Sequence, residues 1–93
     1  MAKVSWTKRS LKDLRSINTY ISLDSAYYAQ LFVAKIVERV DQLIEFPLSG
    51  RIVLEKNDPT IRELIEGNYR IFYRVKLDEI AILRIHNSAK NIK

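Results

Sequence analysis

Four basic side chains recur at alternating positions in two neighbouring segments near the end of the sequence. They are Arg70, Arg74, Arg84 and His86. Both segments alternate between apolar and polar residues, which predicts two paired strands, and paired strands lie about 4.8 Å apart. At that separation the guanidinium groups can converge on one phosphate or carboxylate, two anions that arginine binds well. The same spacing also fits a solvated sheet face on which cross-strand pairs, such as Arg70 with Glu63, neutralise the charge.

Two further cations flank this predicted cluster, one in the preceding loop and one beyond the last strand. With them, the candidate residues for binding a target or a phosphate are Arg51, Arg70, Arg74, Arg84 and Lys90. Phe72 can stack on a base or dock an apolar side chain of a partner. His86 is the natural candidate for proton transfer, because its unperturbed pKa lies near neutrality. A histidine at a strand end is also commonly a structural hydrogen-bonding group.

The composition argues against several other kinds of site. The chain has no cysteine, which excludes disulfides and cysteine-bound zinc, and its single histidine argues against a metal centre. No Ser–His–Asp arrangement and no glycine-rich phosphate loop is visible in the sequence. We therefore expect neither a metal nor a small-molecule cofactor.

The length and the charge describe a small basic protein. Ninety-three residues predict one domain over residues 1–93, since a typical domain has about 100–150 residues. Sixteen Lys and Arg against eleven Asp and Glu give a net charge of +5, with an isoelectric point of about 9.6. This balance favours a polyanion or an acidic protein as partner, although many small proteins are basic for solubility alone. The sequence lacks a membrane span and a secretion signal, so we expect a cytoplasmic protein.

A short strand and two amphipathic helices are predicted for the first half. Residues 3–7 alternate in the manner of a strand, and Thr7 can cap a helix whose apolar residues recur at spacings of three and four. The other face of this helix carries Lys8, Arg9, Lys12, Asp13 and Arg15. Asp24-Ser25 marks a break and a second cap, and the next helix continues to Phe46, before Pro47. Two such helices should lie antiparallel as a hairpin.

The second half changes to an alternation with a period of two. Residues 47–59 are predicted to form a loop with one short strand at 52–54. Residues 61–66, 69–76 and 80–86 are predicted to form three strands, with a tight turn at Gly67-Asn68. Helices on one side of this sheet make an α+β fold.

The loop between the last two strands decides which residues share a face. A two-residue loop at Leu77-Asp78 would place Arg84 among core residues, and burying an unpaired arginine is costly. A third loop residue, Glu79, shifts the register by one and exchanges the two faces. We therefore predict the longer loop, with the following residues on the apolar face: Ile71, Tyr73, Val75, Ala81, Leu83 and Ile85. The open face then carries Arg70, Phe72, Arg74, Ile82, Arg84 and His86.

Short motifs along nearly the whole chain occur in the same order as in a known family. They are Trp6-Thr7, Asp13-Leu14, Tyr20-Ile21, Asp24-Ser25, Phe46-Pro47, Ser49-Gly50-Arg51, Arg62-Glu63-Leu64, the run GNYRIFYRV from Gly67 to Val75, and ILRIH from Ile82 to His86. Each motif is weak alone, but their joint order is fairly specific. The chain resembles the RelE/ParE-type plasmid-stabilisation toxins of type II toxin–antitoxin systems.

The resemblance implies a helical hairpin packed on one face of a small, mostly antiparallel sheet. It also implies a growth-inhibiting toxin that a cognate antitoxin neutralises, with an acidic or amphipathic antitoxin tail covering the basic surface. The family divides by target. RelE-like members cut messenger RNA in the ribosome with the neighbouring 2′-hydroxyl as nucleophile, whereas ParE-like members poison DNA gyrase and are not hydrolases.

Departures from the family's nuclease pattern favour the ParE-like branch. Arg70 matches the arginine of the family's Tyr-Arg strand motif, and a phosphate role carries over with it. The paired lysines of RelE do not carry over, since those positions hold Ile61 and Glu63, and the C-terminal tyrosine of several nucleases is missing. We predict gyrase poisoning without hydrolytic activity; the alternatives are a ribosome-dependent mRNA endonuclease and an inactive binding module. The catalytic residues of the nuclease alternative are Arg70, Arg84 and His86, with Glu55 or Glu63 as a further acid or base.

Overall fold

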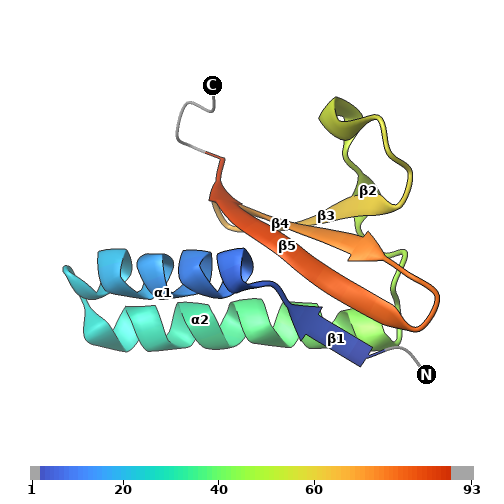
Figure 1. The fold of residues 1–93 in the computed structure, drawn as a ribbon. Coiled ribbons are helices and arrows are strands. Elements are labelled where there is room, and N and C mark those ends of the chain that lie inside the picture. The colour runs from blue at the N-terminus through green and yellow to red at the C-terminus, as the bar shows by residue number, and fades with distance from the viewer. Residues whose placement is uncertain (1–2, 89–93) are drawn as a thin grey trace.

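The computed structural model describes residues 3–88, in which two helices cover one face of a five-stranded sheet (Figure 1). In chain order the elements are β1 (Lys3–Trp6), α1 (Lys8–Ser22), α2 (Ala26–Asp41), the 3-10 turn η1 (Gln42–Ile44), β2 (Arg51–Ile52), the 3-10 turn η2 (Leu54–Lys56), β3 (Ile61–Glu66), β4 (Tyr69–Val75) and β5 (Glu79–Asn87). The predicted α+β fold is confirmed. In the described part of the chain, neither helix is long and apolar enough to cross a membrane.

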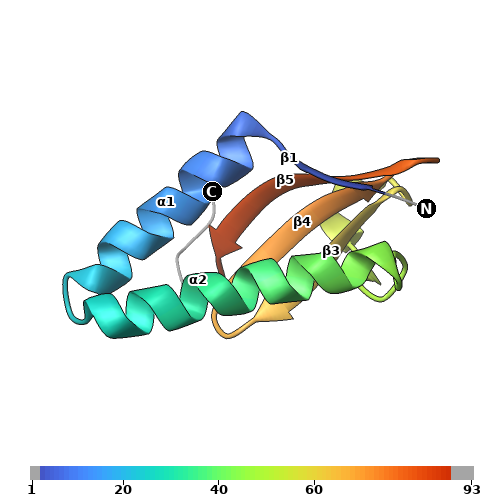
Figure 2. The same cartoon turned by 90° about the horizontal axis from the view of Figure 1, so that it is seen from below.

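Hydroxyl groups cap both helices at their N-termini. The Thr7 side chain accepts a hydrogen bond from the Ser10 N–H, and the Ser25 side chain accepts one from the Tyr28 N–H, each at 3.1 Å. Figure 1 shows the two helices as an antiparallel hairpin beneath the sheet, and Figure 2 shows the same hairpin from below. The predicted caps and hairpin are therefore confirmed. The second helix is shorter than predicted, because the chain tightens into η1 instead of continuing as an α-helix to Phe46.

The strands follow the order β1-β5-β4-β3-β2, with β1 parallel to β5 and every other neighbour antiparallel. Gly67 has a φ of 59°, a left-handed conformation that a tight hairpin turn requires, so the predicted turn at Gly67-Asn68 is confirmed. The short strand predicted at 52–54 is observed as β2 at 51–52, one residue earlier at its start and two at its end, because residues 54–56 form η2.

The β4–β5 loop is shorter than predicted. Tyr73 pairs with Ile82, which is the register of the two-residue loop. Ile80 and Ile82 are therefore fully buried in the core. The predicted positions of Ala81 and Leu83 on the apolar face, and of Ile82 on the open face, are wrong.

A β-bulge keeps Arg84 out of the core despite the short loop. Phe72 pairs with Arg84 while its neighbour Tyr73 pairs with Ile82, so β5 contains one extra residue, Leu83, at this point. Beyond the bulge the pairs are those of the longer-loop register. The prediction assumes one register for the whole hairpin, whereas the strands have the two-residue-loop register near the turn and the three-residue-loop register at the far end.

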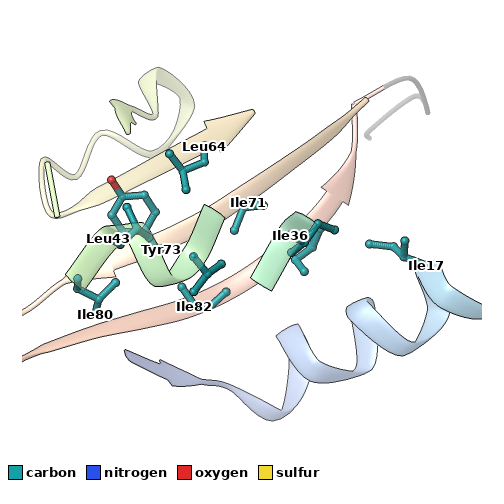
Figure 3. Packing of buried hydrophobic residues seen from close by; sticks show 10 residues of the cluster. Ile17, Ile36, Leu43, Leu64, Ile71, Tyr73, Ile80 and Ile82 are labelled. Carbon is teal, nitrogen blue, oxygen red and sulfur yellow. The ribbon is translucent and has the colours of Figure 1, made fainter. Parts of the chain in front are cut away.

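The core lies between the helices and the inner face of the sheet (Figure 3). Ile36 of α2 and Leu43 of η1 are fully buried, as are Ile71 and Tyr73 of β4. Truncating one such aliphatic side chain to alanine typically costs about 2–5 kcal/mol. This packed layer holds β4 in place, and so positions the side chains that alternate onto the opposite face.

Candidate functional site

The outer face of the sheet, opposite the helices, contains a hollow of about 620 Å³. Four predicted residues line it, namely Arg70, Arg74, Arg84 and His86. Apolar side chains from three strands lie among them: Ile61, Phe72 and Leu83. The structure therefore brings the predicted cluster together on one surface.

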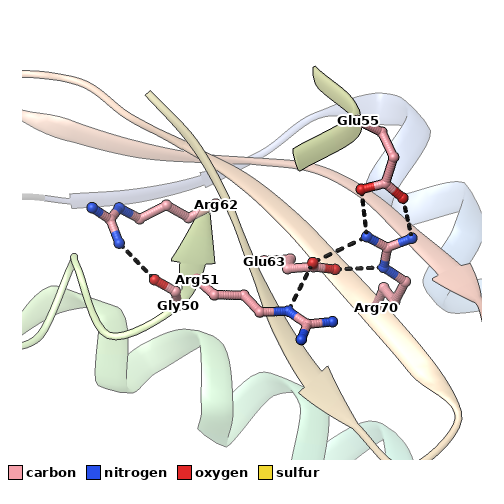
Figure 4. Close-up of polar contacts among 6 residues, drawn as sticks. All are labelled: Gly50, Arg51, Glu55, Arg62, Glu63 and Arg70. Atoms are coloured by element: carbon pink, nitrogen blue, oxygen red, sulfur yellow. Dashed lines mark hydrogen bonds and ion pairs between the residues drawn. The ribbon is translucent and has the colours of Figure 1, made fainter. Parts of the chain in front are cut away.

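Arg70 is bound by two carboxylates. Its Nε pairs with Glu63, and its Nη2 donates to the second oxygen of the same carboxylate at 3.0 Å. Glu55 accepts two further hydrogen bonds from the guanidinium, at 3.0 and 3.3 Å (Figure 4). The hydrogen bonds to Glu63 and Glu55 raise the pKa of Arg70. The guanidinium, which also lies 4.9 Å from the centroid of the Phe72 ring, is charged but has few donors left for a ligand.

Glu63 connects Arg70 to Arg51. The Glu63 side chain is 3% exposed, and the Nε of Arg51 donates to it at 3.0 Å. Burial acts to raise the pKa of Glu63, but hydrogen bonds from Arg70 and Arg51 outweigh it, so the pKa is lowered. Together with Glu55 these residues form the glutamate–arginine network, two cations and two anions without net charge (Figure 4). The cross-strand pair considered from the sequence is confirmed, although its carboxylate is buried rather than solvated.

The two remaining arginines of the predicted cluster are also paired. An Nη2–oxygen distance of 3.3 Å joins Arg74 to Asp58. Arg84 donates to Asp13 of α1 at 2.9 and 3.4 Å, and these hydrogen bonds raise the pKa of Arg84. The Asp13 carboxylate also accepts the backbone N–H of Ile85 at 3.0 Å, beyond the part of β5 that β1 covers. The contact fastens α1 to β5, so Arg84 belongs to the fold as much as to the hollow.

His86 lies beside Arg70 on the neighbouring strand. Its Nε2 is buried and has no hydrogen-bond partner among the residues that the structure describes. Within residues 3–88 no carboxylate forms an ion pair with it. The geometry thus provides no acid–base pair built on this histidine. Lys90, the last candidate cation, lies outside the described residues.

The sequence interpretation missed two carboxylates of the site, Asp13 and Asp58. A signal for Asp13 was present: it lies three residues after Ser10 and four before Ile17, both buried, and helical periodicity places it on the inner side of α1. Asp58 accepts hydrogen bonds from the N–H and the hydroxyl of Thr60, as Asp commonly does in turns. That local turn carries no information about a partner on β4.

A buried tyrosine holds the loop that carries Arg51. The Tyr73 hydroxyl donates to the carbonyl of Pro47 and accepts the N–H of Gly50, both at 2.9 Å. Arg62 donates to the carbonyl of Gly50 at 2.7 Å. A Cβ atom at Gly50 would lie 2.5 Å from the Tyr73 oxygen, so the close approach requires glycine. These contacts place Arg51 at the edge of the glutamate–arginine network.

The arrangement suits a partner that offers both apolar and polar groups. Each described arginine of the cluster already has a carboxylate, so the unpaired positive charge in the lining of the hollow is that of the exposed Lys56. Apolar side chains beside paired charges are typical of surfaces that bind amphipathic segments. Over residues 3–88, no three His, Cys, Asp or Glu side chains are grouped so that they could hold a metal ion.

Known toxins share both the sequence pattern and the fold. The matching family profile, over residues 4–92, is described as the ParE toxin of the type II toxin–antitoxin system parDE. Toxin RelE2 of Caulobacter vibrioides is 36% identical over 91 residues, which cover 97% of this chain and 99% of that protein. The chromosomal ParDE system of P. aeruginosa contains a chain with 33% identity and a TM-score of 0.76, over 94% of this chain and 96% of that one. In the RelBE2 toxin–antitoxin complex of Mycobacterium tuberculosis, a chain with 22% identity shares the fold, with a TM-score of 0.67 over 92% and 96%.

Proposed function

We propose that this chain, which belongs to the ParE toxin family of type II toxin–antitoxin systems, arrests growth by binding DNA gyrase rather than by cutting RNA. The observation that carries the proposal is the pairing of the described sheet-face arginines with carboxylates. Cleavage by a neighbouring 2′-hydroxyl needs a proton acceptor, a proton donor and free cations at the phosphate. In residues 3–88 the arginines of the hollow are paired with carboxylates, and its histidine has no carboxylate partner; the exposed Lys56, which also lines the hollow, forms no ion pair.

Releasing Arg70 to a phosphate would be costly. Its side chain is 14% exposed and that of Glu63 is 3% exposed, so withdrawing the arginine would leave a buried carboxylate without its main partner. Removing one member of a buried ion pair typically costs about 3–5 kcal/mol. This penalty supports a surface that binds a protein, where the ion pairs can remain intact.

Gyrase is the target that the ParE-type resemblance implies. Members of that branch poison the enzyme without hydrolysing a substrate themselves, and such an action needs a binding surface but no acid–base pair. It is consistent with the neutralised arginines of the hollow. Since gyrase acts on the chromosome, the proposal places the chain in the cytoplasm.

A cognate antitoxin completes the proposed system. The related chains from P. aeruginosa and M. tuberculosis belong to a ParDE system and a RelBE2 complex. We infer that an amphipathic antitoxin segment covers the hollow, with apolar side chains against Phe72 and Leu83 and polar groups towards the paired arginines.

A supercoiling assay with purified gyrase tests the proposal. Relaxed plasmid, gyrase and ATP are incubated with increasing amounts of the chain, alone or mixed with its antitoxin. We expect supercoiling to fall as the chain is added and to recover with the antitoxin. Normal supercoiling at saturating chain would refute gyrase as the target.

The RNA-cleavage alternative rests on the likeness to RelE2 and on the contact between the positions of Arg70 and His86. Induced expression, with protein synthesis and DNA synthesis followed separately, distinguishes it. An early loss of protein synthesis that His86→Ala abolishes, in a variant with unchanged thermal stability, would favour the nuclease. A prompt replication defect with intact translation favours gyrase, and tolerated expression would indicate an inactive module.

A further inference from the structure

The sheet-face arginines are paired, and a larger group of unpaired cations in the described chain lies on helix α1. Helix α1 has four basic residues, Lys8, Arg9, Lys12 and Arg15, and all four are exposed. None of them takes part in an ion pair within residues 3–88. The single acid of the helix, Asp13, is turned towards β5, where it binds Arg84. The outer side of α1 is therefore cationic without internal compensation.

Helical spacing gathers hydrogen-bond donors into one row on this side. Positions three and four residues apart lie on the same side of an α-helix. The row, named here the α1 stripe, consists of Lys8, Lys12, Arg15, Ser16 and Thr19, all exposed. Helix α1 contacts α2, β5 and β1, whereas the five residues of this row remain exposed. Every member can donate a hydrogen bond, and none is acidic or apolar.

We propose that the α1 stripe binds the phosphate backbone of duplex DNA without reading its sequence. Lys8 and Arg15 are separated by about 10 Å along the helix, at about 1.5 Å per residue. That length corresponds to about three phosphates of one strand, at about 3.4 Å of axial rise each. Lys, Arg, Ser and Thr are among the side chains that contact phosphates in protein–DNA complexes. The positive end of the helix dipole lies at Lys8 and adds to the attraction.

The composition of the stripe favours a nucleic acid backbone over an acidic protein. Protein–protein interfaces are centred on apolar or aromatic anchors and are depleted of lysine at their core. The exposed Tyr20 and Leu23 adjoin only the C-terminal end of the stripe, and Leu11, the exposed apolar neighbour of its basic half, is partly covered. Single-stranded RNA is bound largely by stacking of bases on aromatic rings, and the basic half of the stripe, Lys8 to Arg15, has no aromatic member; Tyr20 lies beyond it. A regular duplex backbone, which presents only acceptors, is the partner that matches it.

The inference goes beyond the proposed function and does not depend on it. A toxin that holds DNA weakly through α1 would be concentrated where a DNA-bound enzyme works, whichever surface contacts that enzyme. The two proposals use different parts of the molecule, the hollow of the sheet and the outer side of α1. They can therefore be tested separately.

Fluorescence anisotropy with a labelled duplex and the chain alone tests the stripe. The triple variant Lys8→Gln/Lys12→Gln/Arg15→Gln removes three charges from α1. The control Lys3→Gln/Lys35→Gln/Lys76→Gln removes three charges from exposed positions outside α1. Circular dichroism and thermal unfolding establish that both variants are folded.

The dependence of affinity on salt gives the sharpest outcome. Each phosphate contact contributes about 0.9 to the slope of log K against log salt. We expect micromolar binding by the unchanged chain at about 100 mM salt, and a slope about 2–3 smaller in the α1 variant. The control should keep most of the slope. Equal losses in both variants would mean that net charge alone governs binding, and would overturn the proposal.

The same experiment tests whether an acidic protein, rather than duplex DNA, binds the α1 stripe. Absence of duplex binding by the unchanged chain, together with binding to poly-glutamate that the α1 variant loses, would assign the stripe to an acidic protein. That result would overturn the DNA proposal. Gyrase is absent from this assay, so the outcome leaves the supercoiling test untouched.

Discussion

Replacing Glu63 by glutamine tests whether a buried charge organises the sheet face. The Glu63 side chain is 3% exposed and accepts from Arg51 once and from Arg70 twice. Glutamine keeps the shape but brings an NH₂ group against a guanidinium, so at least one hydrogen bond to a charged donor is lost. Such bonds contribute about 1.5–3 kcal/mol each, and loss of one partner of a fully buried pair costs about 3–5 kcal/mol.

The expected loss lies below that upper range, because part of the network is solvated. Arg51 is 68% exposed, and the pairs of exposed side chains contribute little. Arg70 also keeps Glu55 as a partner. We therefore expect Glu63→Gln to lower the free energy of unfolding by about 2–4 kcal/mol at neutral pH.

The pH dependence separates a charge effect from a packing effect. The pKa of Glu63 is lowered in the folded state from an ordinary value of 4.5. Its contribution is thus complete above the unfolded pKa and is lost as the pH falls through the lower, folded pKa. The difference between the original chain and Glu63→Gln should accordingly shrink in acid, where the original carboxylate is protonated as well.

Urea unfolding at a series of pH values measures both quantities. Glu38→Gln is the matched control, since Glu38 is exposed and forms no ion pair within residues 3–88. It should change the stability little. A loss at Glu63 that stays constant from neutral to acid pH would mean that its charge is irrelevant, and the reasoning about the network would be refuted.

Three further substitutions test other parts of the site. Gly50→Ala places a methyl group 2.5 Å from the Tyr73 oxygen and should destabilise the fold by about 1–3 kcal/mol in urea unfolding; an unchanged midpoint would contradict the tight loop. Asp13→Ala leaves Arg84 without its carboxylate and should lower the free energy of unfolding by about 1–3 kcal/mol. Relative to the unchanged chain, hydrogen exchange should accelerate more in β5 than in β3. Leu83→Glu should weaken antitoxin binding at least about tenfold in calorimetry while thermal stability is kept, and unchanged affinity would exclude the hollow as the covered surface.

The elements of this fold were predictable because local signals specify them. Thr7 and Ser25 cap the helices where hydroxyls were expected, and Gly67 adopts the positive φ that its turn requires. The register of β4 and β5 was not predictable in the same way. A period of two gives the two faces of a strand but does not show where one extra residue reverses them, as Leu83 does.

The positions of the site residues were predicted better than their surroundings. Alternation along β4 and β5 brought Arg70, Arg74 and Arg84 to one face, as the structure confirms. Their carboxylates come from distant parts of the chain: Glu55 is 15 residues from its arginine, Asp58 is 16 and Asp13 is 71. No periodicity relates such separations, because they follow from how loop and helix pack on the sheet.

This difference changes how the net charge of +5 is interpreted. A basic strand motif predicts a cationic sheet, yet Arg51, Arg70, Arg74 and Arg84 are each compensated by a carboxylate. The α1 stripe depends only on helical spacing, and no contact within residues 3–88 compensates Lys8, Lys12 or Arg15. Long-range attraction to a polyanion should therefore originate at the helix, whereas the paired arginines of the sheet provide shape and short-range complementarity to a protein partner.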